Sequence, residues 1–247
     1  MKPLKLMLIA FVGVLVLAGG LVYYLLGNLN QLVEGAIEEM GTEMAGTEVS
    51  LEGVNIDLTS GRGELLGLVV ANPPGYRSDF ALKFNKVALA IDPASLAGPV
   101  VRLSEITIKG GQLNAEQKGS NSNLSELLES IESATASEKP AEPPKDPTPP
   151  SSAEDVRLYL QRFVLAGTKA KVIVEGEKPK VIKVPDVRRK AIGDPATGLT
   201  AKQMGDELMH AIIEEVQKAV GAHLAEMAVD AAKDKIKREL GLDRKRE

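Results

Sequence analysis

An uninterrupted apolar run near the N-terminus constrains this chain more than any other feature. Residues 6–26 read LMLIAFVGVLVLAGGLVYYLL and contain no charged side chain. As a helix rising about 1.5 Å per residue, they would span roughly 31 Å, which matches the hydrocarbon core of a bilayer. Tyr23 and Tyr24 lie where interfacial aromatic residues are common. The run predicts a transmembrane helix. A cleaved signal peptide is the alternative, because Ala18-Gly19-Gly20 resembles a small-residue cleavage site.

The charges that flank this run predict its orientation. Lys2 and Lys5 precede it, whereas the first Lys or Arg after it is Arg62. Positively charged flanks stay on the cytoplasmic side. We therefore expect a single-pass protein of the inner (cytoplasmic) membrane, with its N-terminus in the cytoplasm and its bulk in the periplasm of a Gram-negative cell.

Composition excludes several classes of protein. The net charge of −4 is opposite to that of most nucleic-acid binders, which need a clustered positive surface. The absence of cysteine excludes disulfides, thiolate metal sites and a cysteine nucleophile. Aromatic residues make up only 3% of the chain, so its core must be built from aliphatic side chains.

Hydrophobic periodicity predicts a helix, a group of strands and a short second helix. An apolar stripe at spacings of three and four runs through residues 28–45, with Gly46 ending the helix. The stripe could cover one end of a sheet or lie against lipid headgroups, and we favour the sheet because the polar face carries Glu instead of Lys and Arg. Residues 123–133 read as the short helix. The expected strands are 48–58, 63–71, 82–92, 99–108, 111–116, 155–165, 168–175 and 179–186.

A small apolar pattern recurs in these strands. One apolar residue is followed by a second three positions later and by a third two positions after that. A spacing of three breaks the strict alternation of a strand, so each copy predicts a change of face by a bulge or twist. These residues are the candidate lipid groove or protein core, two alternatives that composition does not separate. They are Leu51/Val54/Ile56, Leu65/Leu68/Val70, Phe84/Val87/Leu89 and Leu103/Ile106/Ile108, with a fifth copy at Leu160/Phe163/Leu165.

The last part of the chain predicts a long amphipathic helix from Thr200 to about Leu240. Thr200 and Gln203 form a capping-box pattern. A helix of this length predicts either a break near Gly221 or a partner along its apolar stripe. That stripe is the candidate docking face for another envelope protein or a second copy: Leu208, Ile212, Val216, Val220 and Leu224.

The sequence contains no recognisable catalytic, metal-binding or nucleotide-binding motif. His210 and His223 are the only histidines, and we interpret both as residues on a helix surface. Gly61-Arg62-Gly63 is followed by a strand instead of the helix that a phosphate-binding loop requires. We therefore expect a protein without catalytic residues, metal or cofactor.

The first half of the chain resembles the N-terminal module of AsmA-like proteins. The similarity lies in VSLEGVNIDLTSGRGELLGLVVANPPGY, in KVALAIDPASLAGPVVRLSEITIKGGQLNAE and in NLSELLESI, and it covers roughly residues 1–133. The resemblance implies an inner-membrane anchor, a curved periplasmic β-sheet and a role in cell-envelope maintenance and lipid transport between membranes. This chain is much shorter than the large family members, so direct bridging of two membranes is not expected.

Together these features predict an α+β fold: a transmembrane helix, a twisted antiparallel sheet of about 7–8 strands and a long C-terminal helix. The expected parts are an anchor at 1–27, a helix and sheet module at 28–133, a Pro-rich disordered linker at 134–153, further strands of the same sheet at 154–192 and the final helix at 193–247. The expected function is non-enzymatic: holding lipid, which includes phospholipid, in an apolar β-groove at the bilayer. Alternatively, the chain is an accessory or scaffold subunit that docks through its last helix.

Overall fold

The computed structural model describes residues 27–136 and 156–239. The predicted transmembrane helix, nearly all of the Pro-rich linker and the C-terminal RKRE sequence lie outside these residues. Among the residues that are described, no helix is long and apolar enough to cross a membrane.

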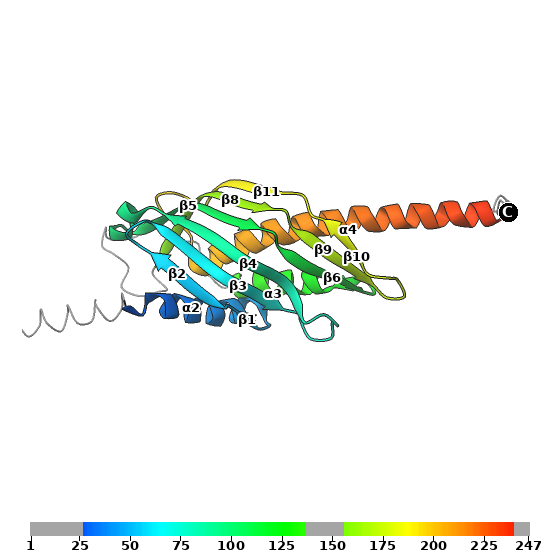
Figure 1. Cartoon of the computed structure of the whole chain (residues 1–247), viewed down its shortest axis with the longest axis horizontal. Coiled ribbons are helices and arrows are strands. Elements are labelled where there is room, and N and C mark those ends of the chain that lie inside the picture. The colour runs from blue at the N-terminus through cyan, green and yellow to red at the C-terminus, as the bar shows by residue number, and fades with distance from the viewer. Residues whose placement is uncertain (1–26, 137–155, 240–247) are drawn as a thin grey trace, which may run out of the picture.

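The described chain is α+β, with a large mixed sheet and a long C-terminal helix (Figure 1). The helices are α2 (Leu29–Ala45), α3 (Asn123–Thr135) and α4 (Ala201–Glu239), with a 3₁₀ helix at Pro93–Ala97. The strands are β1 (Val49–Ser50), β2 (Gly53–Asp57), β3 (Arg62–Ala71), β4 (Phe80–Ile91), β5 (Val100–Lys109), β6 (Gln112–Lys118), β7 (Asn121–Ser122), β8 (Arg157–Ala166), β9 (Lys169–Val174), β10 (Lys180–Lys183) and β11 (Val187–Ile192).

The prediction of a purely antiparallel sheet is wrong at two pairings. β8 pairs with β5, and β9 pairs with β6, in parallel. A parallel pair needs a crossover connection of a dozen or more residues, and the segment between β6 and β8, which contains α3, supplies it. The strands after this crossover join the same sheet, in the order β10-β9-β6-β4-β5-β8-β11.

Three long strands of the sheet are each interrupted once without losing their register. β5 continues as β6 after Gly110-Gly111, β8 continues as β9 after Gly167-Thr168, and β10 continues as β11 after residues 184–186. The residue numbers of paired residues differ by the same amount before and after the interruption, because Val100 faces Arg157 and Gln112 faces Lys169. The expected strand 179–186 is therefore shortened to β10, with Pro185 at the interruption, and β11 is a strand that the sequence did not predict.

A crease runs across the sheet at these interruptions. On one side of it, Val54, Leu65, Val87, Ile108, Leu165 and Val187 are paired strand to strand and all are buried. Beyond Val54, Leu65 and Val87, the next inward position lies three residues away instead of two, at Leu51, Leu68 and Phe84. The strands thus change face, as the recurring apolar pattern predicts. A second step of three occurs in β5, from Leu103 to Ile106, and in β8, from Leu160 to Phe163.

Glycine is required where the crease passes beneath Phe84. A Cβ on Gly111 would lie 2.6 Å from Cε1 of Phe84, too close for any side chain to fit without a shift. On either side of this point Gly110 and Gly167 have φ of 78° and 67°, a backbone conformation that disfavours residues with a Cβ. The crease therefore depends on glycines that a period-two strand pattern cannot explain.

Helix α2 covers the end of the sheet, as predicted, and also caps its edge. The N–H groups of Val49, Leu51 and Ile56 donate to side-chain oxygens of Thr42, Glu38 and Asn30 at 3.0, 2.8 and 2.9 Å. These acceptors lie along one side of α2. They satisfy an exposed strand edge that could otherwise pair with another chain. The helix ends at Gly46, which has φ of 63°.

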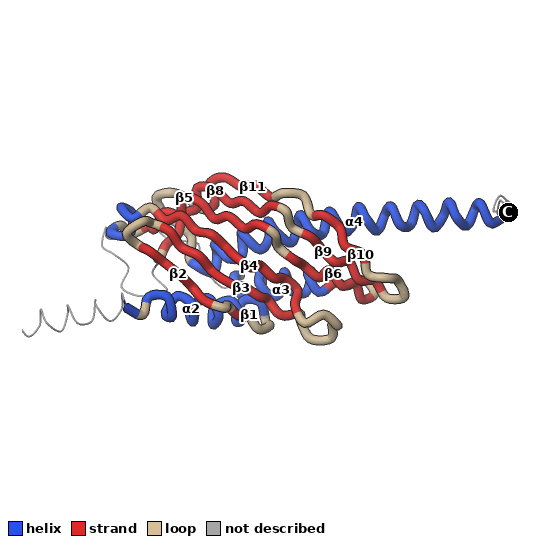
Figure 2. The backbone as a smooth tube through the Cα atoms, in the orientation of Figure 1, coloured by secondary structure: helices blue, strands red, loops and turns tan. Residues whose placement is uncertain are grey.

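Helices α3 and α4 lie on one side of the sheet, behind it in the view of Figures 1 and 2, and α2 runs along the edge formed by β1 and β2. The core lies between them and the strands, and its fully buried side chains include Leu82, Leu127, Phe163 and Ile213. No described helix covers the other side, which is called the open face below.

Helix α4 begins at the predicted capping box and runs without a break. The Thr200 N–H donates to Gln203 Oε1 at 3.0 Å, and the Gln203 N–H donates to Thr200 Oγ1 at 3.1 Å. The expected break at Gly221 is absent, because its surroundings are open and nothing forces the helix to bend. Its 39 residues span about 58 Å.

Candidate functional site

The twelve candidate groove or core residues face the helices instead of an open groove. Eight of them are buried in one continuous core: Val54, Leu65, Val70, Phe84, Val87, Leu103, Ile106 and Ile108. The other four are half-buried and pack against that core: Leu51, Ile56, Leu68 and Leu89. An acyl chain could reach this surface only if α3 and α4 moved away from the sheet.

The candidate docking face of α4 also lies against the chain's own core. Ile212, Val216 and Val220 are buried, while Leu208 and Leu224 are half-buried against the core. An ion pair of 3.5 Å between Glu214 and Arg189 on β11 adds to this packing. The sheet itself is therefore the partner along the stripe, and these five side chains are not free to bind another protein.

The part of α4 that remains uncovered begins after Leu224. From there the helix leaves the sheet and projects beyond it, at the end of the molecule opposite to the start of α2 (Figure 1). Val229 and Ile236 are 52% and 55% exposed. These exposed branched aliphatic side chains, on the part of the helix that extends beyond the sheet, leave an apolar strip available for contact.

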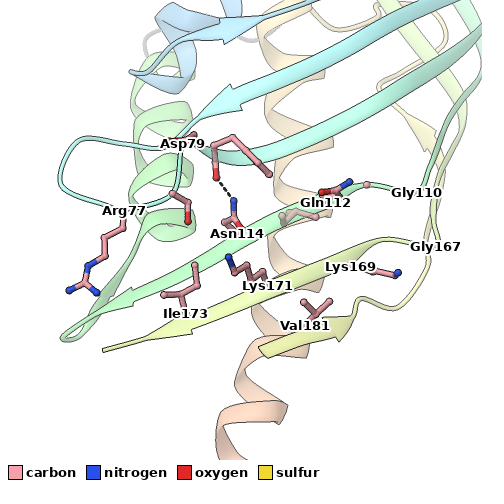
Figure 3. Close-up of a pocket in the computed structure, with 14 residues that line it drawn as sticks. Arg77, Asp79, Gly110, Gln112, Asn114, Gly167, Lys169, Lys171, Ile173 and Val181 are labelled. Carbon is pink, nitrogen blue, oxygen red and sulfur yellow. Dashed lines mark hydrogen bonds between the residues drawn. The ribbon is translucent and has the colours of Figure 1, made fainter. Parts of the chain in front are cut away.

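A hollow of about 880 Å³ lies on the open face of the sheet (Figure 3). Its floor is formed by β6, β9 and β10, and residues 77–80 form one wall. Lys169, Lys171, Ile173 and Val181 project into it from the strands. Their neighbours Ala170 and Val172 are buried on the helix side, as alternation along a strand requires. No sequence pattern indicates this hollow, because its position depends on which strands are neighbours.

A buried carboxylate holds the wall of this hollow in place. Glu116 accepts hydrogen bonds from the N–H groups of Arg77 and Ser78 at 2.9 and 2.7 Å and from Asn72 Nδ2 at 2.8 Å. Asn123, at the start of α3, accepts from the Glu116 N–H at 2.9 Å and donates to Asn72 Oδ1 at 2.7 Å. Burial acts to raise the pKa of Glu116, but the hydrogen bonds outweigh it and leave the pKa below its ordinary value.

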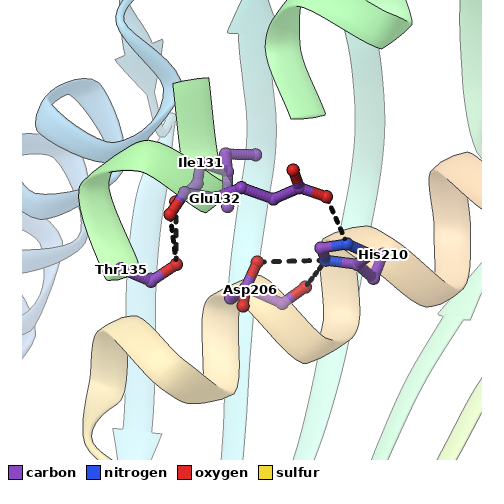
Figure 4. Close-up of polar contacts among 5 residues, drawn as sticks. All are labelled: Ile131, Glu132, Thr135, Asp206 and His210. Carbon is purple, nitrogen blue, oxygen red and sulfur yellow. Dashed lines mark hydrogen bonds and ion pairs between the residues drawn. The ribbon is translucent and has the colours of Figure 1, made fainter. Parts of the chain in front are cut away.

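His210 joins α4 to α3 (Figure 4). Its Nε2 lies 2.8 Å from Glu132 Oε1, and its Nδ1 lies 3.0 Å from Asp206 Oδ1. Partial burial lowers the pKa of His210, but the two carboxylates more than offset this and raise it. His223 is buried, contrary to the expectation of a surface residue, because it lies where α4 still contacts the core. Neither histidine belongs to a cluster of metal-binding groups among the described residues.

Comparisons with protein-family models, with curated proteins and with solved structures found no match. The resemblance to AsmA-like proteins therefore stays a prediction that rests on the motifs quoted above.

Proposed function

We propose that this chain is a non-enzymatic scaffold protein of the cell envelope, tethered to the inner membrane and built on an AsmA-like module. Its docking element is the uncovered part of α4, residues 225–239. The observation that carries the proposal is this helix, which leaves the sheet and exposes Val229 and Ile236. The predicted anchor and the positive charges before it support the membrane tether.

The uncovered helix has the pattern of a coiled-coil seam. Ala222, Ala225, Val229, Ala232 and Ile236 recur at alternating spacings of three and four, and all five are exposed. Small residues such as alanine allow two helices to approach closely. This strip faces away from the stripe of Ile212 and Val216 that packs on the sheet, so docking would leave the fold intact.

Charges beside the seam favour a second copy of this chain in antiparallel orientation as the partner. Glu226 and Lys233 flank the seam on the same side, seven residues apart. In an antiparallel pair, Glu226 of each copy meets Lys233 of the other, whereas in a parallel pair these two residues face Gly221 and Ala228, which carry no charge. Two copies tethered to one membrane would then lie with α4 along its surface, because the start of α2 and the end of α4 are at opposite ends of the chain.

The seam is short, so we expect a weak dimer. An interface of about two heptads is smaller than the roughly 1,200 Å² that stable complexes bury. Tethering both copies in one membrane raises their effective concentration and compensates for a modest intrinsic affinity.

The test is the oligomeric state of the full chain in a mild detergent, measured by size-exclusion chromatography with light scattering. Val229→Glu should shift the wild-type dimer to monomer. Ala231→Glu is the matched control, because Ala231 is exposed on the same turn but lies off the seam. A wild-type chain that remains monomeric at every concentration, or a dimer that both variants weaken equally, would refute this docking mode.

A further inference from the structure

We propose that the hollow on the open face binds an anion that carries clustered phosphate groups. The proposal is independent of the docking role of α4, because the hollow lies on the sheet and involves none of the residues of the seam.

The strand register brings lysines together at and beside the hollow. Lys169 and Lys171 line it, whereas Lys83 and Lys183 lie next to it in the same row. Lys83 faces Gln112, Gln112 faces Lys169, and Lys169 faces Lys183. Residues that face one another in a sheet project from the same side, so three lysines and a glutamine form one row across four strands. Lys171, two residues beyond Lys169, adds a fourth ammonium group to the same face.

These lysines lack carboxylate partners among the residues that the structure describes. Several other cations of the sheet do have carboxylate partners: Lys86 pairs with Glu64, Arg162 with Glu105 and Arg188 with Asp186. Like charges placed directly opposite one another in a sheet are destabilising, and Lys169 and Lys183 are such a pair. A chain with a net charge of −4 thus gathers unneutralised positive charge at one place, which an anion would relieve.

The spacing of the charges indicates the class of anion. Neighbouring strands are about 4.8 Å apart, so Lys169 and Lys183 are close enough to contact adjacent phosphate groups, and Lys83 lies about two strand spacings from Lys169. At the wall, Arg77 lies 3.9 Å from Glu175, so its charge is partly neutralised, and Asp79 is the one carboxylate among the lining residues. A single small anion would satisfy only one or two of these groups, so the row favours a ligand with several phosphates.

The apolar side chains beside the row add a second feature. Val181 is 61% exposed and faces Lys171, and Ile173 lies two residues further along β9. The same phosphate chemistry can come from a soluble oligophosphate or from a phosphorylated lipid headgroup, and only the lipid would also use these aliphatic side chains.

The experiment is isothermal titration calorimetry on the full chain in a nonionic detergent, with tripolyphosphate as the probe. Lys183→Ala should weaken binding by about tenfold or more. Lys180→Ala is the matched control, because Lys180 lies on the same strand but projects from the other side of the sheet, and it should change the affinity less than twofold. Higher salt should weaken binding to the wild type, since exposed charges are screened.

A comparison of glycerol phosphate with dibutyryl phosphatidic acid identifies the source of the phosphate. Tighter binding of the acylated compound, lost on Val181→Asp, supports a lipid headgroup, whereas tightest binding of tripolyphosphate supports a soluble ligand. The proposal is overturned if none of the three probes binds saturably, or if Lys180→Ala and Lys183→Ala weaken binding to the same extent.

Discussion

Replacing Glu116 with glutamine tests whether a buried carboxylate holds the loop that borders the hollow. The side chain is 4% exposed and accepts three hydrogen bonds, two of them from backbone N–H groups. Glutamine has nearly the same shape, but one acceptor oxygen becomes an NH₂ group. That group would face an N–H donor, so at least one hydrogen bond is lost and a donor is left buried without an acceptor.

The expected loss of stability follows from these hydrogen bonds. A hydrogen bond to a charged group contributes about 1.5–3 kcal/mol, and the remaining bonds weaken when the charge is removed. We therefore expect Glu116→Gln to lower the free energy of unfolding by about 2–4 kcal/mol at pH 7. Glu64→Gln is the control, because Glu64 pairs with Lys86 on the surface, where an ion pair contributes about 0–1 kcal/mol.

The pH dependence gives this prediction a second, independent readout. The pKa of Glu116 is lowered in the folded state, so its contribution is present above the unfolded value of about 4.3 and is lost as the pH falls through the folded pKa. Urea unfolding monitored by circular dichroism should show a difference in the free energy of unfolding between wild type and Glu116→Gln. This gap should be constant near pH 7 and should narrow below pH 4. A gap that is absent at pH 7, or unchanged down to pH 3, would refute this account.

Three further predictions concern the helices and the core. Glu38→Ala removes the acceptor for the Leu51 N–H and should expose the sheet edge, which is measured as faster hydrogen exchange at Leu51 and as increased aggregation. Phe163→Ala should cost about 3–5 kcal/mol of unfolding free energy in urea, because Phe163 is fully buried in the core between the sheet and the helices. His210→Ala should lower the free energy of unfolding by up to about 1 kcal/mol below pH 6.5, where the raised pKa keeps the imidazole charged. The loss should become smaller as the pH rises beyond the folded pKa. Equal losses at pH 5.5 and pH 9 would contradict the ion pairs with Glu132 and Asp206.

Local patterns in the sequence predicted the elements well. The spacing of three within the recurring apolar pattern identified the change of face in β2, β3 and β4, because inward positions on a strand must be apolar whatever the neighbouring strand is. Thr200 and Gln203 predicted the start of α4 for a similar reason, since a capping box is complete within four residues.

Features that depend on distant pairings could not be predicted. Glu38 is a residue type expected on a solvated helix face, yet its carboxylate accepts a hydrogen bond from the N–H of Leu51, thirteen residues away on the edge of the sheet. The apolar stripe of α4 was recognised, but only the fold shows that the sheet covers Ile212 and Val216. Glu116 gathers partners about forty residues distant in sequence, and the row of lysines exists only through the strand register.

The most direct test of the scaffold proposal is a charge exchange on the projecting helix, followed by native mass spectrometry of the full chain released from detergent. Glu226→Lys and Lys233→Glu should each weaken the dimer, because each places like charges opposite one another across an antiparallel pair. The double variant restores opposite charges at both contacts and should recover the wild-type proportion of dimer. A double variant that is no more dimeric than either single variant would contradict antiparallel self-docking through α4.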